Sequence, residues 1–332
     1  MCPGTIYRCY FQNSYEEMAP FRKPEIQTGS LQQIMLNLLS IDQQCAHDLF
    51  QPHLFLQQLL DAPSSDKIFT NLKELWDADF ILYQAEQQNN LEKTFTAPTT
   101  RFFQTKLGNQ ISKLPIEPVY GKLLFWAEKL QFDMGQASLA VAALQIPSQN
   151  LKLFQQMESD HMTFLQALWK HQSRFVHQSL DQPLDTLREL FDGRVEGFSK
   201  EVLPLIQLAF KQNVAFYNVK AKDMTLFYQQ NQRVKIHPGS GMFRQNPQLV
   251  MFNEMLTTQK NYLLMVSCGY KIPLLLNNDF QIDYKRRCFS VNGFEVNTQG
   301  VYGAVLSRFL EAVKRFDVGW DIVKELILAE VK

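Results

Sequence analysis

The stretch Arg233-Val234-Lys235-Ile236-His237-Pro238-Gly239-Ser240 alternates charged with apolar side chains and then breaks at a Pro-Gly pair. Alternation with a period of two predicts a half-buried β-strand, and the Pro-Gly pair predicts the turn that ends it. The same period recurs along the chain, at Val214 and Phe216, and at Tyr262, Leu264 and Val266. The chain from residue 213 onward therefore predicts a compact β-barrel.

Two further signals extend this barrel region. Asn292-Gly293 lies between Phe289/Val291 and Phe294/Val296, which is the pattern of a two-residue β-hairpin. A helix that closes the barrel is predicted by apolar residues at helical spacing, namely Val301, Val305, Leu306, Phe309, Leu310 and Val313.

The first third of the chain predicts helices and one hairpin. Ser30 and Gln33 match a capping box. One helical face follows the cap, made of Leu31, Ile34, Met35, Leu38 and Leu39, and a second comprises Ile68, Leu72, Leu75 and Trp76. Residues 93–104 suit a short hairpin, and Gly108 interrupts a brief helix. Two helices and a hairpin within about fifty residues indicate a winged helix.

Residues 118–212 alternate amphipathic segments with short breaks, which predicts a small helical bundle. One of these segments follows Pro183, carries Leu184, Leu187, Leu190 and Phe191 on one face, and stops at Gly193.

The composition excludes several classes of protein. The chain has 332 residues with 33 basic and 33 acidic side chains, so its net charge of +0 attracts neither nucleic acid nor an anionic membrane as a whole. The five cysteines form no C-x-x-C pair, which indicates reduced thiols and no metal site. The sequence shows neither a signal peptide nor a membrane-spanning stretch. We expect an intracellular protein, cytoplasmic or nuclear, with no membrane partner.

Charge is unevenly distributed along the chain. Residues 211–290 hold eleven Lys or Arg against four Asp or Glu, a local balance of +7, and the rest of the chain is correspondingly acidic. A basic barrel with interleaved aromatic residues is typical of a surface that follows a phosphate backbone and stacks bases. A solvated strand face is the alternative, and charge alone does not separate the two.

Nucleotide-binding motifs are absent from the sequence. It contains no G-x-x-x-x-G-K-[ST] loop, no D-E-x-H box and no G-x-S-x-G elbow. Gly239-Ser240-Gly241 opens no helix and has no lysine behind it, which favours a turn over a phosphate cradle.

Several motifs together resemble the C-terminal half of a DEAH-box RNA helicase. Residues 2–10 followed by Pro24-Glu25-Ile26 resemble the segment after the last ATPase motif of that family, and residues 107–122 resemble its passage from winged helix to ratchet domain. Ser159-Asp160-His161 matches its ratchet signature. Residues 233–240 and 254–262 are similar to two strands of its OB-fold, except that Gly239 and Gln259 replace a serine and a lysine.

The resemblance implies a multidomain α+β fold, mainly α-helical and followed by a β-barrel. Residues 1–60 would be a remnant of the second RecA-like domain, whose strand around Ile6 to Tyr10 would lack its sheet. Residues 61–117 would form the winged helix, 118–212 the helical ratchet bundle, and 213–332 the OB-fold with its C-terminal helix.

The resemblance also implies an RNA-binding set of residues. These are Ser159, Asp160, His161, Arg233, Lys235, His237, Gly239, Ser240, Thr257, Thr258 and Lys260. Short hydroxyls and backbone N–H groups there would bind phosphate or ribose oxygens. For Ser159 and Asp160, capping of a helix N-terminus is an equally good explanation, and both roles can hold together.

The implied function is to grip single-stranded RNA for an ATP-driven motor that this chain does not contain. The alternatives are a stand-alone RNA-binding module and a protein-interaction scaffold. Implied partners are RNA, the RecA-like helicase domains and a glycine-rich activator protein. The family uses ATP and magnesium, and we expect no cofactor in this chain.

We predict that the purified chain neither binds ATP tightly nor hydrolyses it, because its sequence offers no residues that hold the β- and γ-phosphates or Mg²⁺. The measurement is ATP turnover with and without RNA. RNA-stimulated turnover by a pure preparation would contradict this prediction.

Overall fold

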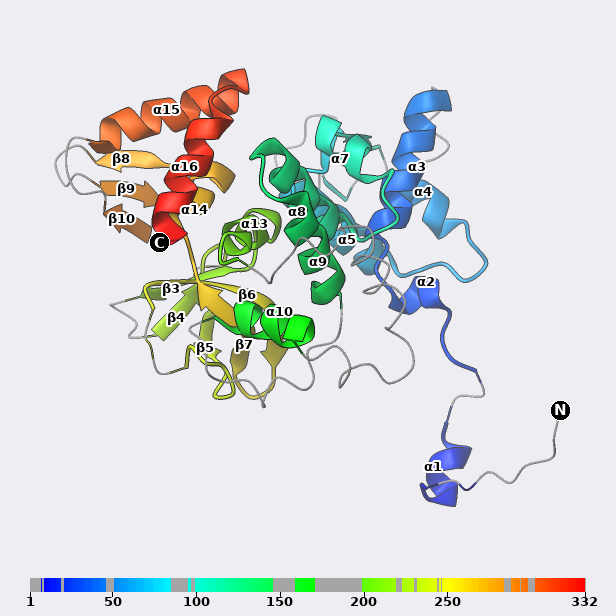
Figure 1. The fold of residues 1–332 in the computed structure, drawn as a ribbon. Coiled ribbons are helices and arrows are strands. Elements are labelled where there is room, and N and C mark those ends of the chain that lie inside the picture. The colour runs from blue at the N-terminus through cyan, green and yellow to red at the C-terminus, as the bar shows by residue number, and fades with distance from the viewer. Residues whose placement is uncertain are drawn as a thin grey trace. The chain divides into compact units, whose positions relative to one another are not determined.

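The computed structural model describes residues 7, 9–18, 21–45, 51–84, 95–96, 99–145, 159–170, 199–218, 223–229, 232–243, 245, 247–283, 288–292, 294–297 and 302–331. The chain forms two compact units, Met1–Ser112 and Lys113–Lys332. The helices and strands of both units are labelled in Figure 1.

The first unit is built of short helices and a two-stranded hairpin. Its elements are α1 (Gln12–Glu16), α2 (Glu25–Thr28), α3 (Gln32–Cys45), α4 (Pro52–Gln57), α5 (Ser65–Asp77), β1 (Ile81–Gln84), β2 (Arg101–Gln104) and α7 (Lys106–Ile111). One apolar core runs from Leu31 to Ile111. It therefore includes residues from both sides of the expected module boundary at residue 60.

Helices α3 and α5 form the centre of this core, as their sequence pattern predicts. Leu31, Met35 and Leu39 pack in one cluster with Ile68 and Leu72, whereas Ile34, assigned to the same face, is exposed. The capping box at the start of α3 differs from expectation, because Ser30 Oγ accepts from the backbone N–H of Gln32. Helix α5 is capped by Ser64, whose Oγ accepts from the N–H of Lys67.

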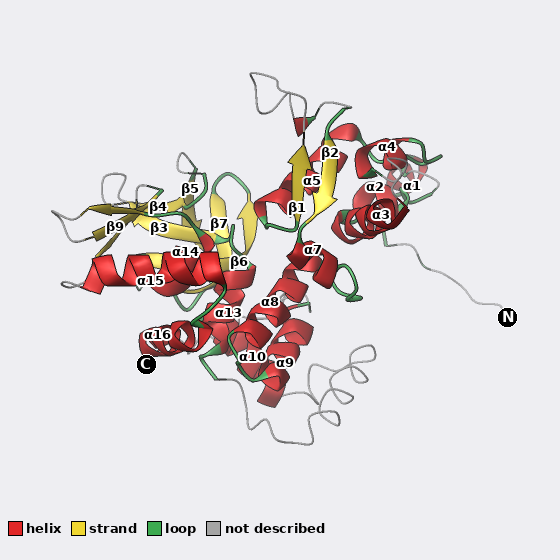
Figure 2. Cartoon of the chain, turned by 90° about the horizontal axis from the view of Figure 1, so that it is seen from above, coloured by secondary structure: helices red, strands yellow, loops and turns green. Residues whose placement is uncertain are grey.

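The hairpin lies beside α5 in Figure 2, and its position corrects the sequence analysis. It pairs β1 with β2, from Ile81 opposite Gln104 to Gln84 opposite Arg101. The expected hairpin at residues 93–104 thus contains only the second strand.

Gly108 lies inside α7 and does not interrupt it. A Cβ at this position would collide with the carbonyl oxygen of Phe80. That carbonyl also accepts a hydrogen bond from the N–H of Thr105 at 3.0 Å, so it is fixed in place. Close approach of the backbone, rather than a break in the helix, explains the glycine.

The expected strand at Ile6 to Tyr10 is wrong for the residues that can be described there. Tyr7, Cys9 and Tyr10 are in no strand, and Tyr7 is 86% exposed. The short helix α1 that follows buries none of its residues.

The second unit begins with helices that pack in one core. They are α8 (Pro118–Lys129), α9 (Met134–Leu144), α10 (Asp160–Lys170) and α13 (Val202–Ala209). The expected helix behind Pro183 lies outside the described residues. All eight residues of α13 are buried, because α13 packs against α8, α9 and α14 (Lys271–Asn277).

A closed five-stranded barrel follows. Its strands are β3 (Val214–Asn218), β4 (Asp223–Leu226), β5 (Arg233–Ile236), β6 (Leu249–Thr257) and β7 (Asn261–Cys268), paired in the order β3-β4-β5-β7-β6. Strands β5 and β7 are parallel, and the other neighbours are antiparallel. This barrel confirms the prediction made from the period-two pattern.

Strand β7 departs from the alternation read in the sequence. Leu263 and Val266 both lie in the barrel core although they are an odd number of residues apart. Met265 has a positive φ of 52° and packs in the other core, with the helices. This local twist reverses which face each side chain points to, so Tyr262 and Leu264 are only partly buried.

The predicted hairpin at Asn292 exists but is not part of the barrel. Strands β9 (Cys288–Val291) and β10 (Phe294–Asn297) pair with each other, and β8 (Gln281–Asp283) completes a separate three-stranded sheet. Asn292 has the positive φ of 46° that such a turn requires.

Two helices complete the unit. In α15 (Tyr302–Phe316), Leu310 and Val313 are buried as predicted, but Val305 is exposed. Helix α16 (Trp320–Val331), whose Val323 and Ile327 are fully buried, was not predicted from the sequence.

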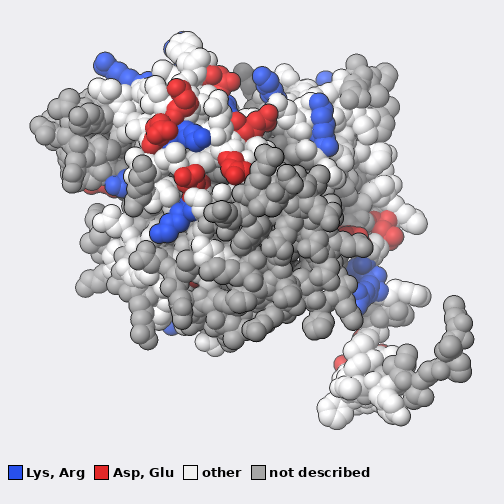
Figure 3. All heavy atoms as spheres, viewed as in Figure 1, with Lys and Arg blue, Asp and Glu red and all other residues white. Residues whose placement is uncertain are grey.

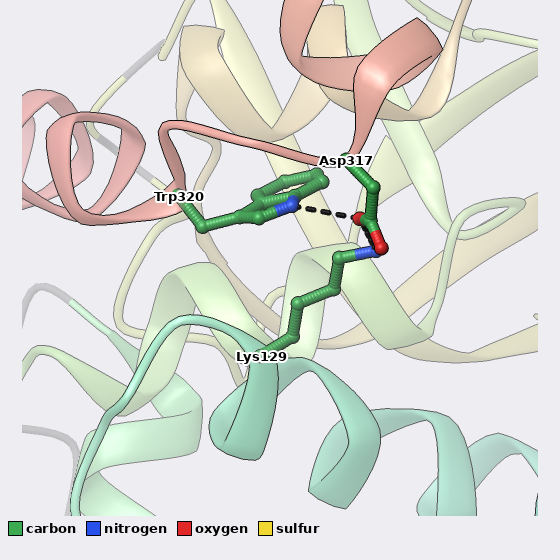
Figure 4. A network of polar contacts seen from close by, with 3 residues as sticks. All are labelled: Lys129, Asp317 and Trp320. Atoms are coloured by element: carbon green, nitrogen blue, oxygen red, sulfur yellow. Dashed lines mark hydrogen bonds and ion pairs between the residues drawn. The ribbon is translucent and has the colours of Figure 1, made fainter.

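The turn between α15 and α16 is attached to the end of α8 (Figure 4). Lys129 Nζ lies 2.7 Å from Asp317 Oδ1 and 4.3 Å from the centre of the Trp320 ring, and the indole N–H of Trp320 donates to the same carboxylate oxygen. Because the carboxylate is largely exposed, the ring contacts contribute more than the ion pair.

We predict that Gly108→Ala destabilises the first unit by about 1–3 kcal/mol, because the added methyl group forces a backbone shift. Hydrogen exchange of residues 65–111 measures the loss. The control is Gly29→Ala, where the Cβ would lie 3.2 Å from its nearest neighbour and φ is −76°. Equal effects of the two substitutions would contradict this account.

Candidate nucleic-acid interface

The outer face of β5 carries two exposed basic side chains. Arg233 and Lys235 point outward, and Val234 and Ile236, between and after them, are buried in the barrel core. This arrangement follows directly from strand geometry, in which successive side chains point to opposite faces. A pair of cations is thereby held on a rigid element.

Strand β7 adds aromatic surface next to these cations. Lys235 is the register partner of Tyr262, and the Tyr262 ring meets the His237 ring edge-on with 5.7 Å between centroids. Both rings are half-buried. Tyr262 was not among the predicted binding residues, although it ends the motif at residues 254–262.

The turn between β6 and β7 lies at the same end of the barrel as the start of β5, because β5 and β7 are parallel. Thr257, Thr258 and Lys260 are all exposed there. The hydroxyl group of Thr258 is used within the turn, donating to the carbonyl of Lys260 at 3.1 Å and accepting from its N–H at 3.4 Å. Thr258 therefore shapes the turn.

We call Arg233, Lys235, Tyr262, Thr257 and Lys260 the β5 face. On the face of the molecule that Figure 3 shows, acidic and basic side chains are interspersed over α8 and α16. Of the eleven basic residues between 211 and 290, six lie outside the described residues: Lys220, Lys222, Arg244, Lys285, Arg286 and Arg287.

The predicted ratchet residues lie at the start of α10 and contact the barrel. Ser159 caps the helix, since its Oγ accepts from the N–H of Met162 at 3.1 Å. The same oxygen lies 2.6 Å from Ser267 Oγ on β7, and His161 Nδ1 lies 2.7 Å from that Ser267 oxygen. Ser159 and Ser267 also form an antiparallel backbone bridge.

Asp160 connects the same helix to two further places. Its Oδ1 accepts from the backbone N–H of Gly241, and its Oδ2 accepts from the N–H of Val266, both at 2.9 Å. The motif at residues 159–161 and the turn after β5 are 81 residues apart in the chain, and Asp160 brings them together. We call the contacts of Ser159, Asp160 and His161 with Gly241, Val266 and Ser267 the α10 joint.

His161 is completely buried in this joint. Burial lowers the pKa of its imidazole from 6.5 to about 3, so the ring is neutral near pH 7. Its Nε2 has no hydrogen-bond partner among the described residues. His161 thus faces the protein interior, and its predicted contact with RNA has no exposed atom to make it in this conformation.

The remaining predicted residues lie in the turn after β5. The N–H of Gly239 donates to His237 Nδ1 at 3.0 Å, and the N–H of Ser240 donates to the carbonyl of His237 at 2.9 Å. Residues 238–241 form a turn, which confirms the interpretation of Gly239-Ser240-Gly241. The structure thus places Arg233, Lys235, Thr257 and Lys260 on the β5 face and Ser159, Asp160 and His161 in the α10 joint. Of the other predicted residues, His237, Gly239 and Ser240 lie in the turn after β5, and Thr258 lies in the turn before β7.

Comparisons with known proteins agree with this architecture. A model of the oligonucleotide/oligosaccharide-binding (OB) fold matches residues 202–274, which include α13 and the whole barrel. A pre-mRNA-splicing factor ATP-dependent RNA helicase of Arabidopsis thaliana, DEAH10, is 25% identical over 309 residues, covering 79% of this chain and 39% of the relative. The chain is similar in sequence to DEAH-box RNA helicases.

A second match is shorter. RNA editing associated helicase 2 of Trypanosoma brucei brucei is 30% identical over 122 residues, which are 37% of this chain and 5% of that protein. The chain thus spans 39% or less of the length of these curated relatives. The resemblance to the C-terminal region of DEAH-box helicases, with its OB-fold, is confirmed. No helix in the described part of the chain is both long and apolar enough to cross a membrane.

We predict that this chain loses stability as the pH falls below 6.5. The folded-state pKa of His161, about 3, lies below the unfolded value of 6.5, so the unfolded state binds more protons between these values. Between pH 6.5 and 5 the free energy of unfolding should fall by up to about 2 kcal/mol.

Urea unfolding at several pH values measures this effect. His161→Asn removes the titrating group and should flatten the pH dependence in this window, although the variant is less stable throughout. Parallel pH profiles for the wild type and the variant would show that another group is responsible.

Proposed function

We propose that this chain is an accessory region that grips single-stranded RNA along the β5 face, for an ATP-driven helicase motor that the chain itself lacks. The observation that carries the proposal is the position of Arg233 and Lys235, both exposed on the third strand of an OB barrel. In OB-folds, the second and third strands and the loop between the fourth and fifth bind oligonucleotides.

The chemistry of the β5 face suits a single strand of nucleic acid. Arg233, Lys235 and Lys260 supply cations for phosphates, and Tyr262 supplies a ring next to them on which a base can stack. Contacts to the phosphate backbone do not distinguish base sequences. Binding should therefore show little sequence preference.

The wider organisation is proposed from the relationship to DEAH-box helicases. We assign residues 61–117 to a winged helix and 118–212 to a ratchet bundle, preceded by the end of a RecA-like domain. The α5, β1–β2 and α7 elements support the winged helix, and the packing of α8, α9, α10 and α13 supports the bundle. ATP and magnesium would then act in the RecA-like domains, in a cytoplasmic or nuclear protein.

We predict that Arg233→Gln with Lys235→Gln weakens binding to all single-stranded RNA sequences about equally. Loss of two phosphate contacts should lower the magnitude of the salt slope by roughly one to two units, at about 0.7 per contact for single strands. Fluorescence anisotropy of labelled RNA at several salt concentrations measures both effects.

The matched control replaces Lys200 and Arg308 with glutamine, which changes the charge equally at two exposed positions outside the barrel. Lys122 also lies outside the barrel, but it cannot serve as a surface control because its side chain in α8 is only 2% exposed. Equal losses of affinity in the two double variants would show that the β5 face is not the binding surface.

A further inference from the structure

We propose that Asp160 is a positioning residue that sets the RNA affinity of the barrel without contacting RNA. Its carboxylate holds the turn after β5 in place from the start of α10. The inference rests on the proposed function, because it assigns to Asp160 a role in the same RNA-binding site.

The first step is the geometry of the carboxylate. Each of its two oxygens accepts one backbone N–H, from Gly241 in the turn and from Val266 in β7, both at 2.9 Å. Hydrogen bonds to an ionised acceptor are about twice as strong as those between neutral groups. One side chain therefore fixes the distance between the turn and β7.

The second step concerns what the turn carries. Met242, next to Gly241, is completely buried in the barrel core, whereas Phe243 is 46% exposed. At the other end of the turn, the His237 ring contacts Tyr262 of the β5 face. A shift of Gly241 thus displaces groups that border the proposed RNA path.

The third step is that Asp160 is itself held rigidly. Ser159 and His161, on either side of it, both lie within hydrogen-bond distance of Ser267 Oγ, and the backbone of Ser159 bridges to Ser267. Helix α10 cannot rotate about its N-terminus without breaking these contacts. The side chain between them is therefore pre-organised, as positioning residues must be.

The two possible roles of Asp160, as a nearby charge and as a positioning residue, predict opposite changes in RNA affinity for Asp160→Asn. If Asp160 merely lay near RNA, removing its negative charge would strengthen binding to a polyanion. As a positioning residue, its loss should weaken binding on the order of tenfold, because one of the two backbone bonds loses its acceptor. The salt slope should not change, since no phosphate contact is removed.

The experiment combines amide hydrogen exchange of the full chain with anisotropy of labelled single-stranded RNA. In Asp160→Asn we expect faster exchange at Gly241 and Val266 together with the weaker binding. The matched control is Asp133→Asn, because Asp133 caps α9 through the N–H groups of Gly135 and Gln136 and has no hydrogen bond to the described residues of the barrel. Both of those N–H groups bond to one oxygen of Asp133, and asparagine caps helices about as well as aspartate, so this variant removes a charge without removing an acceptor. It should leave RNA affinity unchanged.

If Asp160→Asn does not fold, Asp160→Glu replaces it. Glutamate keeps the charge but moves the carboxylate by one methylene, so it should also accelerate exchange at Gly241 and weaken RNA binding. Wild-type affinity in a folded variant, or unchanged exchange at Gly241, overturns the inference while the proposed function stands. Absence of RNA binding by the wild-type chain overturns the proposed function, and the inference with it.

Discussion

The part of the barrel wall formed by residues 249–252 of β6 and 263–267 of β7 is buried on both sides, and the rest of the second unit depends on this constraint. Val250 and Phe252 of β6 point into the barrel, while Leu249 and Met251 pack in the core shared with the helices. A strand in this position must be apolar on both faces, as in a parallel sheet covered by helices. Because helices occupy this side of the barrel, the exposed basic residues of β5 mark the wall that remains open to a ligand.

Positive φ at Met265 makes two-sided burial possible in β7. With strict alternation, Leu263 and Val266 could not both point into the barrel. The conformational reversal at Met265 directs its own side chain toward the helices, and Ser267 two residues later faces α10. The kink therefore determines that the polar group of Ser267, rather than an apolar side chain, meets Ser159 and His161. The joint between helix and barrel depends on one backbone dihedral angle.

Local patterns in the sequence predicted much of this architecture. Four features each depend on a few neighbouring residues whose periodicity or turn chemistry predicts the structure. These are the barrel, the apolar face of α5, the turn at Gly239-Ser240 and the pairing of β9 with β10. Arg233 and Lys235 were predictable as a pair for the same reason, because alternation in one short strand fixes their direction.

Features that depend on distant residues were not predictable in this way. Nothing in the sequence near Asp160 indicates that its carboxylate oxygens accept hydrogen bonds from the backbone N–H groups of Gly241 and Val266, which are 81 and 106 residues away. The hairpin at Asn292 was recognised as a hairpin but placed in the wrong sheet, because turn chemistry says nothing about the partner of the outer strands. A signal for the joint did exist, since Ser267 is a polar residue within the apolar run of β7.

The polar character of the α10 joint has a physical reason. Ser159, His161 and Ser267 are all buried, and one nitrogen of the His161 ring lacks a partner among the described residues, which costs free energy. Apolar residues of similar volume would hold the helix against the strand at least as tightly. They would also let it slide, because apolar contacts are not directional. Hydrogen bonds to one serine oxygen and two backbone N–H groups fix both the rotation and the height of α10 on the barrel. The polar α10 joint is therefore less stable than an apolar contact of similar volume would be, but it defines a single position for the turn that borders the β5 face.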